Sequence, residues 1–363
     1  MAFTNFRKET SERSDASNWA KQSLIQNTPY HFDSIEGCNE NDGNIATHLM
    51  ERARVDYDGN DNNMSIDSIR IAIQGLETEA VLQRKINFAK AFRLNLTYVL
   101  YNDETQKVWM YEFESLENLK LVQKFDSFTS FSAWIAQIKG WKSTKSFREI
   151  ADLPLFDKVL RRAGTAWPTN IDCFISDEDN QPVAILEFQN AKTTSVKDHC
   201  NNEFFLCKQE YSDSITGSVK YHDDIRRWLS QEILRVQSGL RLFIITWAQG
   251  SEDFILKEVE EITFPELPFA NDWNKTNRYK QDMHNYAVKK DVDSGRKIVR
   301  NYQSFNLEYE PPVMKKILHD PPLSAKDKTF PFIYYKYKWK IMSDGMELPR
   351  LFKNLIELDD VVL

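Results

Sequence analysis

Three polar side chains in one short stretch of this chain have the types and spacing of a metal-dependent site. Asp172 opens an apolar run, and Glu187 and Gln189 close a second apolar run that follows an acidic turn. Residues two apart in a strand share a face, so Glu187 and Gln189 project together. If the turn is centred between positions 179 and 180, Asp172 pairs with Glu187, because antiparallel partners sum to a constant. We therefore expect the three polar groups to meet at one end of an apolar hairpin.

Convergent carboxylates at the end of a sheet form a hard oxygen site suited to Mg2+, which prefers a few carboxylates together with waters and phosphate oxygens. Such an ion lowers the pKa of a bound water and neutralises the charge that builds on a phosphodiester. The residue types therefore favour phosphodiester hydrolysis. The simpler alternative is a structural protein in which Asp172 and Glu187 are solvated ends of a surface hairpin.

Hydrophobic periodicity indicates which elements position this stretch. Ser65 has the character of an N-cap for a long helix, and the segment NDETQK is typical of a hairpin loop between two strands. The expected elements, in chain order, are helix Ile66–Phe92, strands Leu94–Tyr101 and Val108–Phe113, helices Phe125–Trp141 and Leu155–Ala163, the hairpin that carries Asp172 and Glu187, helix Tyr221–Ser238, the buried strand Leu240–Thr246 and an edge strand over Phe254–Phe264. This order indicates an α/β (α+β) fold with a mixed sheet flanked by helices.

Composition divides the chain into three predicted parts. Residues 1–64 are polar and read as a loop-rich segment with one short helix over 45–55. Residues 65–264 form the expected core. Prolines punctuate the chain after that, which favours a C-terminal aromatic and basic subdomain over residues 265–363. Its segment Phe330–Ile341 alternates aromatic and Lys side chains as a strand would, with a basic face that either binds phosphates or is simply solvated. The sequence gives no sign of an internal repeat.

The succession of Asp172, a hairpin, Glu187-x-Gln189, an amphipathic helix and a buried strand resembles the PD-(D/E)XK superfamily of restriction-endonuclease-like nucleases. The resemblance covers residues 65–250. It implies a Mg2+-dependent endodeoxyribonuclease that hydrolyses double-stranded DNA in the manner of a type II restriction enzyme, with Mn2+ as a substitute ion. A homodimer would suit the cutting of both strands. Asp172, Glu187 and the backbone carbonyl of Phe188 would hold the metal, and Gln189 would position the attacking water.

The chain departs from the family pattern at Gln189, where Lys is usual, and the motif Pro is displaced to Pro168. A positive charge could come from Lys192 just beyond the strand, or from Lys197 or Lys208, although spacing assigns none of the three. The missing lysine keeps a second hypothesis open, in which the chain is a non-catalytic nucleic-acid- or protein-binding module that retains the nuclease fold.

Two further groups of residues were candidates for metal binding. Helical spacing turns Glu79 beside the inward face of its helix, so it is a candidate ligand for the same ion, although a solvated edge position is the simpler interpretation. His199, Cys200 and Cys207 include no paired CxxC and no clear fourth ligand. Incidental or buried thiols are therefore favoured over a zinc site.

Charge and cysteine usage set the expected environment. The formal net charge of −7 argues against general nucleic-acid binding by the whole surface, although Lys and Arg slightly outnumber Asp and Glu after residue 264. The four cysteines form no CxxC pair and Cys173 lies in a predicted buried strand, which favours a reducing, intracellular (cytoplasmic) compartment. There is no long apolar run, so we expect neither a secretory signal nor a membrane span.

Overall fold

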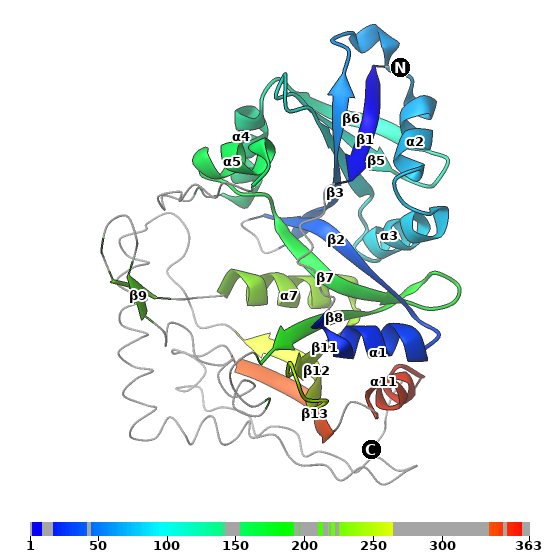
Figure 1. The fold of residues 1–363 in the computed structure, drawn as a ribbon, viewed down its shortest axis with the longest axis vertical. Coiled ribbons are helices and arrows are strands. Elements are labelled where there is room, and N and C mark those ends of the chain that lie inside the picture. The colour runs from blue at the N-terminus through cyan, green and yellow to red at the C-terminus, as the bar shows by residue number, and fades with distance from the viewer. Residues whose placement is uncertain are drawn as a thin grey trace. The chain divides into compact units, whose positions relative to one another are not determined.

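A computed structural model describes residues 2–8, 17–41, 45–140, 153–191, 225–263, 334–343 and 347–357, with short pieces at 142, 196, 210–212, 217 and 219–221. The chain divides into two compact units. The first comprises Met1–Glu12, Phe32–Pro182 and Val236–Gly239, and the second comprises Arg13–His31, Val183–Arg235 and Leu240–Leu363. The strands of each unit combine parallel and antiparallel pairs of a mixed sheet, and helices flank them (Figure 1), which confirms the α+β class at this level. No helix in the described part of the chain is both long and apolar enough to cross a membrane.

The sheet of the first unit has the strand order β7-β2-β3-β4-β5-β6, with β1 also paired to β3. Only the β3–β4 pair is parallel among the pairs whose registers are described in this unit. Parallel neighbours need a crossover connection, which α2 and α3 provide. The strands are β1 (Phe3–Lys8), β2 (His31–Glu40), β3 (Ala46–Tyr57), β4 (Leu96–Tyr101), β5 (Val108–Phe113), β6 (Leu119–Phe125) and β7 (Thr169–Ser176); the helices are η2 (Asp61–Asn63), α2 (Ile66–Gln74), α3 (Glu79–Ala91), α4 (Phe128–Lys139) and α5 (Leu155–Arg162).

The crossover consists of two helices because the chain supplies two N-caps. The Ser65 side chain accepts a hydrogen bond from the backbone N–H of Ser68, which confirms the predicted start of α2. The helix ends at Gly75, and the Thr78 side chain caps a new helix by accepting from the backbone N–H of Val81. The prediction of one continuous helix over residues 66–92 was therefore wrong.

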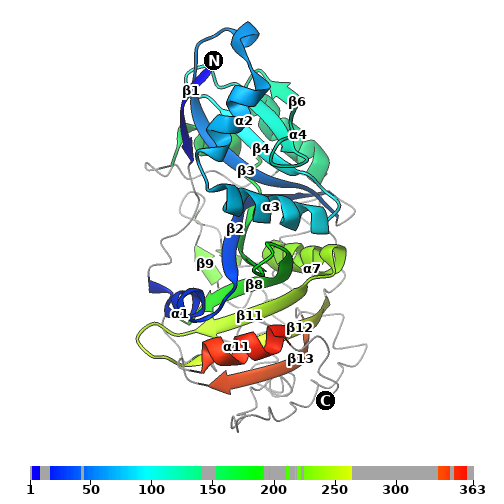
Figure 2. The same ribbon diagram turned by 90° about the vertical axis from the view of Figure 1, so that its right-hand side faces the viewer.

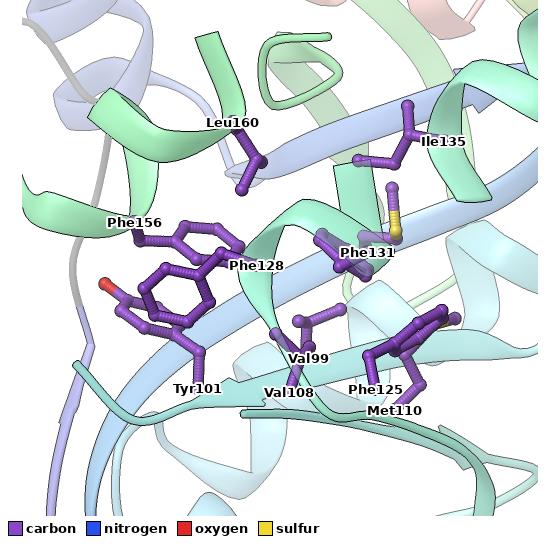
Figure 3. Close-up of a cluster of buried hydrophobic side chains, with 11 residues drawn as sticks. Val99, Tyr101, Val108, Met110, Phe125, Phe128, Phe131, Ile135, Phe156 and Leu160 are labelled. Atoms are coloured by element: carbon purple, nitrogen blue, oxygen red, sulfur yellow. The ribbon is translucent and has the colours of Figure 1, made fainter. Parts of the chain in front are cut away.

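The main apolar core of the first unit lies between the sheet and the helix pair α4–α5. Tyr101 of β4 stacks on Phe156 of α5 with ring centroids 4.2 Å apart, and Phe128 of α4 meets Phe156 edge-on at 4.9 Å. Figure 3 shows these rings together with the apolar side chains of β4, β5 and the end of β6. Aromatic pairs of this kind contribute beyond the area that they bury. They fix α5, and with it the point where the chain enters β7.

The second unit has the strand order β13-β12-β11-β8, in which β8 and β11 are parallel and the other pairs are antiparallel. Helix α7 lies in the chain between the two parallel strands. Helix α11 lies over the sheet (Figure 2), where its Phe352 contacts Phe243 of β11, and α1 packs against α11. The elements are α1 (Trp19–Asn27), β8 (Pro182–Asn190), β9 (Glu210–Ser212), β10 (Val219–Tyr221), α7 (Ile225–Ser238), β11 (Arg241–Trp247), β12 (Phe254–Thr263), β13 (Tyr334–Ser343) and α11 (Leu348–Glu357).

Several sequence predictions are confirmed and others are corrected. The predicted elements β4, β5, α4, α5, α7 and β11 are present within a few residues of their expected ends, and a strand occupies Tyr334–Ser343. The expected loop over residues 31–64 was wrong, because two long strands lie there. Strand β12 is not an edge, since β13 pairs with it opposite β11. The three consecutive parts expected from composition stay a prediction, and residues 264–333 lie outside the described chain.

The aromatic core predicts a large cost for truncating its central ring. Phe156→Ala removes a fully buried side chain from between two aromatic neighbours, so we expect the free energy of unfolding to fall by about 3–5 kcal/mol. Leu155→Ala, one residue earlier and partly exposed, is the matched control and should cost much less. Urea denaturation of the two variants provides the measurement, and equal losses would contradict this account of the core.

Candidate functional site

Glu187 and Gln189 lie in the second unit, on the buried strand β8. Their residues are only 5 % and 8 % exposed, although both carry polar groups. In the parallel ladder Glu187 is in register with Ile244 and Gln189 with Thr246. The Thr246 hydroxyl donates a hydrogen bond to Gln189 Oε1 at 3.3 Å. The prediction that both side chains belong to a buried strand is therefore confirmed, and the amide of Gln189 is held by the neighbouring strand.

A buried lysine lies in the same row of the sheet as Glu187. Lys257 of β12 is directly opposite Ile244 of β11, which is itself in register with Glu187. Residues in register on neighbouring strands share a face of the sheet, so Glu187, Ile244 and Lys257 line one face. Lys257 is 0 % exposed, which is rare for a lysine and requires that its charge be compensated. The sequence alone pointed to a lysine within residues 192–208, whereas Lys257 lies about fifty residues further along the chain.

Asp172 lies in the first unit, on β7. It is partly buried, and the Asn170 side-chain amide donates a hydrogen bond to its Oδ1 at 2.6 Å. The turn after β7 is closed by hydrogen bonds from Asp177 N to Gln181 O and from Asn180 N to Asp177 O. The turn is therefore centred on position 179 and not between positions 179 and 180. The predicted pairing of position 172 with position 187 is thus shifted by one residue at the turn. A site shared by Asp172 and Glu187 remains a prediction.

The remaining predicted site residues are exposed or lie outside the described chain. Glu79 is exposed in the first turn of α3, where a carboxylate complements the helix dipole, and this agrees with its simpler interpretation. Lys192, Lys197, Lys208 and the cluster of His199, Cys200 and Cys207 lie outside the described residues. Within the described ranges, no three His, Cys, Asp or Glu side chains are grouped so that they could hold a metal ion.

The first unit contains a buried ionic cluster that the sequence analysis missed. The side chain of Glu51 on β3 is completely buried. Lys85 of α3 places its Nζ 3.0 Å from Glu51 Oε1 and 2.8 Å from Glu77 Oε2. Lys8 of β1 pairs with the same two carboxylates, 2.9 Å from Glu51 Oε2. Two ammonium groups thus neutralise two carboxylates, and a hydrogen bond from the backbone N–H of Glu36 to Glu51 Oε1 adds to them.

A second buried pair lies beside this cluster. Arg52, the residue after Glu51, places Nη1 3.0 Å from Asp157 Oδ1 on α5. Its guanidinium also lies over the Trp167 ring, 4.9 Å from the centroid. Since successive residues of a strand face opposite sides of the sheet, Glu51 points to α3 and Arg52 to α5. Strand β3 therefore buries opposite charges on its two faces and pairs each with a different helix.

Mutual pairing sets the protonation of the ionic cluster. Burial alone would raise the pKa of Glu77, but the ammonium groups of Lys85 and Lys8 outweigh it and lower that pKa below its usual value. Burial alone would lower the pKa of Lys85, but Glu51 and Glu77 together raise it above its usual value. Both shifts favour the charged forms, so the cluster is an internal salt and not a general acid or base.

A weak signal in the sequence could have revealed this cluster. Glu51 directly follows the two apolar residues Leu49 and Met50, as Glu187 directly follows Ile185 and Leu186. The charged residues around Glu51 concealed the strand, because they break the alternation by which a half-buried strand is recognised.

Replacing Lys85 tests whether the ionic cluster contributes to the free energy of unfolding. Lys85→Met leaves Glu51 and Glu77 with only one ammonium group, and breaking a buried pair costs about 3–5 kcal/mol. Lys90→Met removes an exposed lysine from the same helix and should have little effect. The free energies of unfolding of the two variants give the comparison, and similar values would show that the cluster contributes nothing to stability.

The lowered pKa of Glu77 predicts how the stability of the first unit depends on pH. Because this pKa is lower in the folded state, its contribution to stability is present above the ordinary carboxyl pKa and is lost as pH falls through the folded value. Glu77→Gln should therefore flatten the loss of stability between neutral and acidic pH, whereas Glu104→Gln on the surface should not. Unfolding curves recorded from pH 7 down to acid measure this, and parallel pH profiles for wild type and Glu77→Gln would refute it.

The chain was compared with known families, proteins and structures. No protein-family model, curated protein or solved structure matches it. The side chains and strand registers of this chain are therefore the basis for any functional proposal.

Proposed function

We propose that this protein is a Mg2+-dependent endodeoxyribonuclease that hydrolyses DNA phosphodiesters in the manner of a type II restriction enzyme. The observation that carries the proposal is the buried carboxylate of Glu187 on β8. Burying a carboxylate is costly, and catalytic metal sites are a common reason to retain one. The order of β7, β8, α7 and the parallel strand β11 supports the same reading, since it is the order that the nuclease resemblance requires.

The donor chemistry of the proposed site suits Mg2+. Two carboxylates and one carbonyl oxygen are enough protein ligands, because Mg2+ keeps several waters and takes phosphate oxygens from its substrate. Asp172, Glu187 and the carbonyl of Phe188 would hold the ion, and Mn2+ could replace it. When bound, the ion would supply a water of lowered pKa and offset the charge on the phosphate. Gln189, hydrogen-bonded to Thr246, would orient the attacking water through its amide.

Lys257 supports the proposal because it supplies a positive charge that the family pattern takes from a lysine at the position of Gln189. The motif lysine is replaced by Gln189, which removes a positive charge from β8. Lys257 restores a cation in the row of Glu187, two strands away, and a lysine side chain is long enough to extend over the intervening Ile244. We therefore propose Lys257, in place of Lys192, as the group that offsets the phosphate charge.

A second candidate function follows from the hydrogen bond between Thr246 and Gln189. A side-chain amide that accepts a hydrogen bond from the neighbouring strand is also expected of a residue with a purely structural role. The protein would then be a nucleic-acid-binding module that retains the fold without catalysis. It would bind double-stranded DNA with a steep salt dependence and never cut it.

Cleavage of supercoiled plasmid in Mg2+ tests the proposed nuclease. We expect Glu187→Gln and Asp172→Asn to lower the rate by at least about 100-fold, since each removes a charged metal ligand. Lys257→Met should lower it by a smaller factor. Glu178→Gln, which changes an exposed carboxylate in the turn between β7 and β8, is the matched control and should cut like the wild type.

The outcomes separate the two candidate functions. A Glu187→Gln protein that cuts as fast as the wild type would refute the site. Wild-type protein that binds DNA but leaves it intact in both Mg2+ and Mn2+ would establish the binding module. Direct conversion of circles to linear DNA would indicate that a homodimer acts on both strands.

A further inference from the structure

The same succession of elements occurs twice along the described chain. In the first half, α1 to α4, the strands β2 and β3 are followed by a helical crossover and by β4, β5 and β6. In the second half, α5 to α11, the strands β7 and β8 are followed by α7 and by β11, β12 and β13, with the short pair β9–β10 inserted before α7. The prediction that the chain has no internal repeat was therefore wrong at the level of topology.

The strand registers agree between the two halves. Strand β3 is parallel to β4, which is antiparallel to β5, and β8 is parallel to β11, which is antiparallel to β12. The first hairpin ends with the pair Tyr101–Val108 and the second with the pair Trp247–Phe254, so each hairpin loop has six residues. In both halves a further antiparallel strand follows, with a register shift in its ladder.

A left-handed residue follows the crossover helix at the same place in both halves. Arg93 after α3 has a φ of 61°, and Gly239 after α7 has a φ of 70°. Each lies eight residues before the end of the next strand, at Tyr101 in one half and at Trp247 in the other. Residues other than glycine rarely adopt this conformation. Its presence at Arg93 therefore indicates a shared backbone path.

A spaced residue pattern accompanies the shared path. Glu51 and Glu187 are each in register with the residue three positions before the last pair of the following hairpin. Each directly follows two apolar residues, and each lies fifteen positions after a carboxylate that follows an isoleucine, in the pairs Ile35-Glu36 and Ile171-Asp172. These matches are too few and too widely spaced to be recognised as a repeat without the strand registers.

The opening helices of the two halves are swapped. The first unit contains the last helix of the first half, α4, packed against α5, which opens the second half. The second unit contains the last helix of the second half, α11, packed against α1, which opens the first half. Each unit is thus completed by a helix from the other half of the chain.

Both swapped helices are built into the units that they complete. In the second unit Leu24 of α1 is buried, and the Trp19 indole N–H donates a hydrogen bond of 2.8 Å to the carbonyl of Ala248 after β11. In the first unit Phe156 and Leu160 of α5 are buried in the aromatic core formed with β4, β5 and α4. Neither helix is a surface addition.

We propose that the two halves are two copies of one fold with swapped opening helices, so that a single chain takes the place of a homodimer. Swapping an identical element between protomers is a low-cost route to a dimer. Here both swapped helices already lie on units of the same chain, so neither is available to complete a second chain. One chain would therefore engage one DNA duplex. The DNA rests on the proposed function, whereas the swap does not.

Amide hydrogen exchange in the full-length protein tests the helix swap. Leu24→Ala in α1 should raise exchange rates in β11 and β12, in the other half of the chain, by at least about tenfold, because it removes buried contacts from the second unit. Leu160→Ala in α5 should do the same to β4 and β5. Ile25→Ala and Leu155→Ala change more exposed residues of the same two helices and are the matched controls. Valine replaces alanine at positions 24 and 160 if either variant fails to fold.

Light scattering and the concentration dependence of cleavage test whether a single chain acts. We expect the mass of one chain for the free protein. Plasmid cleavage in Mg2+ should have an initial rate that rises in proportion to protein concentration. Two chains that assemble on DNA would instead give a rate that rises with the square of the concentration.

The outcomes keep this inference apart from the proposed nuclease. Exchange that rises only in the half carrying the substitution, a free protein with the mass of two chains, or a cleavage rate that follows the square of the concentration would each overturn the inference. Protein that never cuts DNA refutes the nuclease instead, and the exchange rates and the free mass then decide the inference by themselves.

Discussion

The electrostatic cost of burying Glu51 constrains much of the first unit. A carboxylate in the middle of a sheet, with no exposed surface, is tolerated only when a partner charge and hydrogen bonds replace its lost water. Lys85 meets this requirement from α3 and Lys8 from β1, so the charge holds both elements against β3. On the opposite face Arg52 does the same for α5 through Asp157. The placement of three elements thus follows from two adjacent residues of one strand.

A parallel strand pair followed by an antiparallel strand occurs in both units, as β3–β4–β5 in the first and β8–β11–β12 in the second. Such a ladder fixes where each side chain projects, whatever its type. Glu51 and Glu187 lie on the same rung, because each is in register with the residue three positions before the last pair of the following hairpin. Lys85 and Lys8 meet Glu51, whereas the buried Lys257 lies in the row of Glu187.

The second unit combines three features that suit phosphodiester chemistry. Glu187 is a buried carboxylate, Gln189 is held by Thr246, and Lys257 brings a buried cation into the row of Glu187. In the nuclease pattern the cation and the carboxylate belong to one strand. Here they would come from β12 and β8, which lie on either side of β11. Sheet register can thus restore a charge that the linear motif lacks.

The sequence by itself determined the elements whose signal is local. Apolar runs and the turn chemistry of residues 102–107 located β4, β5 and β11, and helical spacing located α4 and α5, because periodicity depends only on neighbours in the chain. Tertiary structure decided which charged residues are buried and which are exposed. Glu51 and Lys257 lie inside the protein because their surroundings come from distant segments, and the free energy of a buried charge depends on those surroundings. Local patterns carry only a weak trace of that information, so the strands β2 and β3 and the ionic cluster were established by the folded chain.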